Sequence, residues 1–205
     1  MSLFKMLLNE LYENKIYSDL DRVKENVTSK INDFAQKYLS PEAYRSYLDE
    51  ARKVVYEVSE LPSKIGFYYD RAKNTFRRFV SGVLGYYDLL RNKIVLNRYL
   101  PKDEVESVLA HESVHQATRK WALEYFRRFG EAARPVIEGF TELITRQLGY
   151  YSRAYDEYVK AAEDTLRMFG YNTRQTLYDI LNFRKSPESV LGSFYRSLSP
   201  RCCYA

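Results

Sequence analysis

The stretch His111-Glu112-Ser113-Val114-His115 lies in a segment with helical spacing of apolar residues, and it contains both histidines of the 205-residue chain. Side chains four residues apart on an α-helix lie one turn apart and point in nearly the same direction. Two imidazoles so placed suit one tetrahedral metal ion, and the Glu112 carboxylate could reach a water molecule on that ion. The stretch therefore predicts a metal site with His111 and His115 as ligands.

Histidines on an apolar helix face can also be hydrogen-bonded core residues. Val108, Ala122, Phe126 and Phe129 share the histidine face, so the rings should be buried on either interpretation. Burying two imidazoles without a shared partner is costly, because each neutral ring carries one donor and one acceptor. The spacing, and the lack of any other histidine in the sequence, favour the metal site.

Short apolar runs precede this helix. Residues 83–88 and 93–97 flank a four-residue connection, which predicts a β-hairpin. Residues 65–69, aromatic and with a glycine, predict a further strand, whereas residues 70–79 are ambiguous. The histidine helix should begin at Pro101 to Asp103, run to about Phe129 and end at Gly130.

A second helix is expected from Pro135 to near Gly149, with its apolar residues in one stripe. Glu138 and Glu142 lie one turn apart on the opposite side. They could be solvated surface acids with Arg146 as an ion-pair partner, and the spacing alone does not exclude this.

The flanking sequence is predicted to be helical. Residues 1–62 carry possible helix N-caps at Ser18 and Ser40, and residues 152–198 suggest three helices broken at Gly170 and Pro187. The expected organisation is an N-terminal helical segment (1–62), a core (63–149) and a C-terminal helical segment (150–205), packed as one compact unit.

Composition argues against several classes of protein. The 32 basic and 27 acidic residues are interspersed, so the net charge of +5 gives little support to nucleic-acid binding. The sequence lacks a long apolar span and a signal-peptide pattern, which predicts a cytoplasmic protein without a membrane partner. Cys202 and Cys203 are adjacent, which argues against a disulfide framework.

HESVH followed by IEGFTELITRQLG resembles the gluzincin zinc metallopeptidases, which carry HExxH on one helix and a glutamate ligand on the next. The second stretch is similar to the NEGFA motif of zinc aminopeptidases, although Ile137 replaces the asparagine. The resemblance covers residues 82–149 and implies an α+β, predominantly helical fold. Its zincin-like core would contain a small antiparallel sheet, the HExxH helix and the glutamate helix, flanked by helical arms.

The resemblance implies one zinc ion per chain, bound by His111, His115 and Glu138, with water in the open fourth position. Glu112 would be the general base that activates this water. Glu142 would accept the outer N–H of a ligating histidine. Gly139 would let the two helices approach closely.

The resemblance also implies that a peptide or protein substrate pairs with an edge strand at Gly85, Tyr86 and Tyr87. Aminopeptidase relatives carry a glutamate in a GxMEN strand, but residues 81–86 contain no acid, so endopeptidase action is expected. Gluzincins stabilise the oxyanion with a histidine or a tyrosine. The chain has no third histidine, so a tyrosine or an arginine would take this role, and the candidate tyrosines are Tyr150, Tyr151, Tyr155, Tyr171 and Tyr178.

Two other classes of protein are possible. A di-iron helical bundle would use Glu112-x-x-His115 but needs a second Glu-x-x-His element, for which no histidine remains. A zincin-like binding or regulatory protein with little or no proteolysis is the stronger alternative. The sequence does not specify an oligomeric state.

Overall fold

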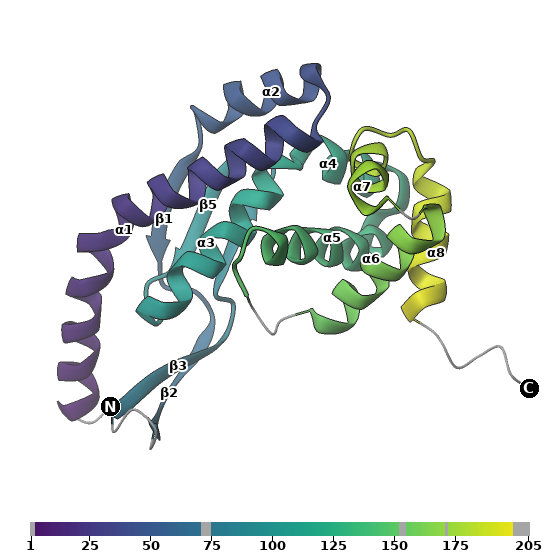
Figure 1. Ribbon diagram of the computed structural model, residues 1–205. Helices are drawn as coiled ribbons and strands as arrows, with labels where there is room; N and C mark the ends of the chain where they lie inside the picture. The colour runs from purple at the N-terminus through teal and green to yellow at the C-terminus, as the bar shows by residue number, and fades with distance from the viewer. Residues whose placement is uncertain (1–2, 71–74, 152–154, 171, 199–205) are drawn as a thin grey trace, which may run out of the picture.

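The computed structural model describes residues 3–70, 75–151, 155–170 and 172–198, with side chains described for 20–62, 82–101, 103–151, 155–170 and 172–198. The described chain is predominantly helical, with a small three-stranded mixed sheet (Figure 1). Tyr171 and the two cysteines lie outside the described residues. Among those described, none of the helices is apolar over a stretch long enough to cross a membrane.

The N-terminal arm, up to residue 62, begins with two helices, α1 (Leu3–Tyr38) and α2 (Pro41–Ala51). The predicted N-cap at Ser18 is wrong, since α1 continues through it; residues 3–38 contain no glycine or proline to end the helix. Ser40 does cap α2, because its Oγ accepts the N–H of Ala43 at 3.3 Å. α1 lies along α3 (Lys102–Ala117) and contributes Val27, Ile31 and Phe34 to the core.

Part of the predicted N-terminal helical segment is a strand. β1 (Val55–Ser59) pairs in parallel with β5 (Lys93–Asn97), with Tyr56 opposite Ile94. Tyr56 and Val58, two residues apart, pack against the core, which is the alternation of a strand. The helical interpretation of these residues was wrong. Valine and tyrosine also favour β-strands, and here they form a strand paired with β5.

The predicted hairpin is confirmed, with β4 (Gly85–Asp88) antiparallel to β5. The sheet order is β1-β5-β4, so the expected antiparallel sheet is in fact mixed, with β4 at an edge. The strand predicted at residues 65–69 is β2 (Ser63–Asp70), and the ambiguous segment contributes to β3 (Thr75–Gly82). These two form a separate antiparallel ribbon, which in the view of Figure 1 runs from the three-stranded sheet toward the N-terminal end of α1.

The predicted histidine helix is divided in two at Thr118, giving α3 and α4 (Arg119–Phe129). Thr118 has φ −98° and ψ 12°, and its Oγ1 donates to the Val114 carbonyl at 2.8 Å. Such bonding by threonine to the preceding turn often bends helices. α4 ends at Gly130, as predicted, and a short 3₁₀ helix (Gly130–Ala133) leads into α5 (Arg134–Gln147).

α5 lies at the centre of the helical layer, between α3 and the C-terminal helices (Figure 1). The latter are α6 (Asp156–Phe169), α7 (Thr173–Leu181) and α8 (Pro187–Leu198), with the predicted breaks at Gly170 and Pro187. Because α5 is covered on most sides, its buried residues include Glu142 and Thr145 as well as its apolar stripe. The interpretation of Glu142 as a solvated surface acid is therefore wrong.

Candidate metal centre

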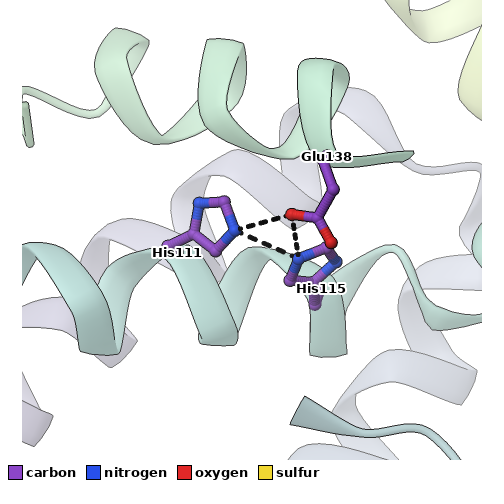
Figure 2. Close-up of side chains that lie close together, drawn as sticks. All are labelled: His111, His115 and Glu138. Carbon is purple, nitrogen blue, oxygen red and sulfur yellow. Dashed lines mark hydrogen bonds and ion pairs between the residues drawn. The ribbon is translucent and has the colours of Figure 1, made fainter. Parts of the chain in front are cut away.

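His111 and His115 of α3 face Glu138 of α5, and three of their atoms converge (Figure 2). His111 Nε2 lies 3.1 Å from His115 Nε2 and 3.2 Å from Glu138 Oε2. His115 Nε2 lies 3.3 Å from the same carboxylate oxygen. The structure thus brings together the three residues that the sequence suggested as metal ligands.

The shape of this triangle can be compared with that of a metal site. Ligand atoms at the corners of a tetrahedron with zinc bonds of about 2.0–2.1 Å lie about 3.3–3.4 Å apart. Hydrogen bonding alone suits the triangle less well, because a ring N–H points best at one acceptor and each corner has two neighbours about 60° apart. The three atoms could therefore hold one metal ion.

The outer nitrogen of each ring also has a partner on α5. His111 Nδ1 lies 3.0 Å from Glu142 Oε2, and His115 Nδ1 lies 3.2 Å from Thr141 Oγ1. A ring that binds a metal through Nε2 carries its proton on Nδ1, which these oxygens are placed to accept. Thr141 was missed in the sequence, although its position three residues after Glu138 puts it on the same helix face.

The electrostatics of the centre favour positive charge. Burial disfavours a charged imidazole, but the hydrogen bonds to Glu138 and Glu142 outweigh burial and raise the pKa of His111 to about 10. Burial opposes ionisation of Glu138 too, yet its bonds to both histidines keep the pKa of that carboxyl well below its usual range. Burial raises the pKa of Glu112. A proton on the imidazole or a bound metal cation would offset the negative charge of these buried carboxylates.

A cleft of about 340 Å³ opens beside the histidines. Glu112 lines it, and the carboxylate accepts a hydrogen bond from the backbone N–H of Tyr87 on β4. Gly85 and Tyr86 line the cleft as well, so all three predicted substrate-binding residues lie there. A Cβ on Gly85 would come within 2.8 Å of Val108 Cγ1, so the glycine allows β4 to lie close to α3.

Tyr155 forms another wall of the cleft. Its ring stacks on that of His111 with centroids 5.7 Å apart and an interplanar angle of 16°. Among the candidate tyrosines that the structure describes, the other three lie outside this lining: Tyr150 lies against Lys30, Tyr151 against Arg146 and Tyr178 against Arg184. Burial, followed by the charges of nearby glutamates, raises the pKa of Tyr155, so its hydroxyl stays protonated.

A larger cavity of about 560 Å³ lies elsewhere, lined by residues of α2, α4 and α7. Its lining does not include the histidines or Glu138. A further cavity, of about 650 Å³, lies beside Asn172 and Leu177, so the candidate centre is not in the most voluminous cavity. The convergence of ionisable side chains selects the smaller cleft.

The chain was compared with known proteins. No model of a protein family matches it, and searches of curated proteins and of solved structures find no match either. The candidate centre therefore stands on the residues and geometry of this chain.

Proposed function

We propose that the chain is a zinc-dependent peptidase in which His111, His115 and Glu138 hold one zinc ion. The observation that carries this proposal is the nearly equilateral triangle of His111 Nε2, His115 Nε2 and Glu138 Oε2, with sides of 3.1, 3.2 and 3.3 Å. Imidazole and carboxylate ligands suit zinc, and three protein ligands leave a fourth position open, as in catalytic sites. The similarity to the gluzincin motifs supports the same assignment.

A zinc ion bound there would make water more acidic and polarise a scissile carbonyl. Glu112 lies in the cleft beside the ligands, and the Tyr87 N–H orients its carboxylate. In the proposed mechanism Glu112 takes the proton of the attacking water and later returns a proton to the leaving amine. Tyr155, whose hydroxyl stays protonated, is the proposed donor to the developing oxyanion.

The proposed substrate is an extended peptide lying along β4. This strand is at the edge of its sheet and borders the cleft through Gly85, Tyr86 and Tyr87. Pairing through main-chain hydrogen bonds tolerates many side chains. Residues 81–86 provide no carboxylate for a substrate's amino terminus, so endopeptidase action is proposed over aminopeptidase action.

The proposal is tested by metal analysis of protein purified without added zinc, together with cleavage of a peptide library. We expect one zinc per chain, lost in both His111→Ala and His115→Ala, and a melting temperature lowered by chelator. Glu112→Gln should keep its zinc and lose about a hundred- to ten-thousand-fold in activity. Native protein without stoichiometric metal would refute the zinc site, whereas zinc without hydrolysis would favour a metal-dependent binding protein.

A further inference from the structure

Glu142 is a carboxylate buried beneath the candidate centre, with a side chain that is 1% exposed. Its two oxygens have different partners. Oε2 faces His111 Nδ1 at 3.0 Å, and Oε1 accepts a hydrogen bond from Arg146 Nε at 3.0 Å. A buried carboxylate needs such partners, because an unpaired charge in the interior is strongly destabilising.

Arg146 extends the connection to the next helix. Its Nη2 donates to Asp156 Oδ1 at 2.5 Å, and Asp156 is the first residue of α6. The preceding residue, Tyr155, stacks on His111. The contacts therefore form a closed ring from His111 through Glu142, Arg146 and Asp156 to Tyr155 and back to His111.

We propose that Arg146 is a positioning residue of the metal centre, which orients His111 through Glu142 and fixes Tyr155 over the cleft through Asp156. This inference rests on the proposed zinc site. It implies that zinc binding and the seating of the first turn of α6 are coupled, because both depend on the orientation of the His111 ring.

The charges of the site agree with this role. Glu112, Glu138 and Glu142 lie around the centre, and Arg146 places its single positive charge between Glu142 and Asp156. A divalent cation would offset two further negative charges. The planar guanidinium can bind two carboxylates at once through different nitrogens, which a lysine ammonium does not reproduce.

Zinc affinity, measured by competition with a chromogenic chelator, tests the link to His111. We expect Arg146→Met to bind zinc about ten- to a hundred-fold more weakly than wild type, and Arg146→Lys to recover part of the loss. Arg167→Met is the matched control: this arginine pairs with Asp164 on the exposed face of α6, and its loss should leave zinc affinity unchanged. Wild-type affinity in Arg146→Met would overturn the proposal.

Hydrogen exchange tests the link to α6 and does not depend on activity. The Val159 N–H donates to the Tyr155 carbonyl at 2.8 Å in the first turn. Zinc should slow exchange in this turn in wild type, and Asp156→Asn should abolish that slowing while retaining zinc. An equal effect of zinc on both proteins would overturn the coupling.

These results separate the two proposals. Wild-type protein that binds no zinc would remove both the metal site and the role of Arg146. Zinc binding that is indifferent to Arg146→Met and Arg146→Lys would leave the proposed function intact and refute only the positioning role. If Arg146→Met does not fold, Arg146→Lys and Asp156→Asn decide the matter.

Discussion

Glu138 and Glu142 face different nitrogens of the same imidazole, and this difference separates their roles. Glu138 Oε2 lies 3.2 Å from His111 Nε2, whereas Glu142 Oε2 lies 3.0 Å from Nδ1. Of the two glutamates, Glu138 also lies 3.3 Å from His115 Nε2, so it could bind the same metal ion as both histidines. A carboxylate on the outer nitrogen instead fixes the ring's tautomer.

We therefore predict that Glu138→Ala abolishes stoichiometric zinc binding, whereas Glu142→Ala weakens it about ten- to a hundred-fold. Isothermal titration of both variants measures the difference. Thr141→Val, which removes the partner of His115 Nδ1, serves as a third variant and should also weaken binding without abolishing it. A metal-free Glu142→Ala with a zinc-binding Glu138→Ala would place the ligand one turn further along α5.

Tyr155→Phe is predicted to lower kcat about a hundred- to a thousand-fold, because it removes the hydroxyl proposed to donate to the oxyanion but keeps the ring that stacks on His111. Zinc affinity should not change. Tyr178→Phe, on α7 beside Arg184, is the control and should retain wild-type kcat. An unchanged kcat in Tyr155→Phe would mean that another group stabilises the oxyanion.

The residues of the candidate centre differ in how well their positions could be predicted from the sequence. His111 and His115 were predictable, because four-residue spacing on one helix fixes the relative direction of two side chains. Tyr155 could not be selected from the tyrosines, because its place depends on α6 packing against α5. Arg146 was expected as a surface partner of the glutamates; the burial of Glu142 changes the meaning of that contact.

Packing between elements depends on Gly139 in a way that the sequence did not indicate. It was expected to bring α5 close to the histidine helix. A Cβ there would instead meet the Tyr158 carbonyl at 2.6 Å and Phe194 Cε2 at 2.9 Å, on α6 and α8. The glycine thus permits the close approach of the C-terminal helices to the back of α5.

Gly139→Ala should destabilise the fold by about 1–3 kcal/mol, since the methyl group would push against a backbone carbonyl. Gly192 in α8 is a matched control: a Cβ there meets nothing within 4 Å. Gly192→Ala should be neutral or stabilise by up to about 1 kcal/mol through helix propensity. Urea unfolding of the two variants measures the difference, and equal stabilities would show that α6 can shift without cost.

Helices and the hairpin were predictable as elements because their signals are local. The Ser40-Pro41 cap, the hairpin at residues 85–97 and the breaks at Gly170 and Pro187 all rest on neighbouring residues. β1 was missed because its partner, β5, lies far along the chain. Short apolar segments of this kind fit a helix or a strand until the partner is known.

At the scale of the molecule, the described side chains share a hydrophobic core that extends from Leu20 of α1 to Phe194 of α8. β1 supplies the parallel neighbour of β5, and α1 covers α3, the helix that carries both histidines. Arg119, just after α3, bonds to Glu50 of α2 at 2.7 Å. The N-terminal arm therefore helps to hold α3 and β5 in place beside the candidate metal centre.

From this arrangement we predict that residues 63–205, expressed alone, will neither unfold cooperatively nor bind stoichiometric zinc. The fragment lacks Val27, Ile31 and Phe34, which are buried in the intact chain. At about 1.5–3 kcal/mol for each buried apolar side chain, their loss is comparable with a typical total stability of about 5–15 kcal/mol. The loss of β1 also leaves one side of β5 without its parallel partner.

Adding a separate chain of residues 1–62 should restore both properties, because the contacts of α1 with α3 and of β1 with β5 are non-covalent. Circular dichroism melting and zinc titration follow the recovery, and a 1–62 chain with Ile31→Asp is the control that should fail, since it would bury an unpaired charge. If residues 63–205 alone bind zinc and melt cooperatively, the arm is dispensable. The support of α3 would then come from α5 and the β4–β5 hairpin, which also contact it.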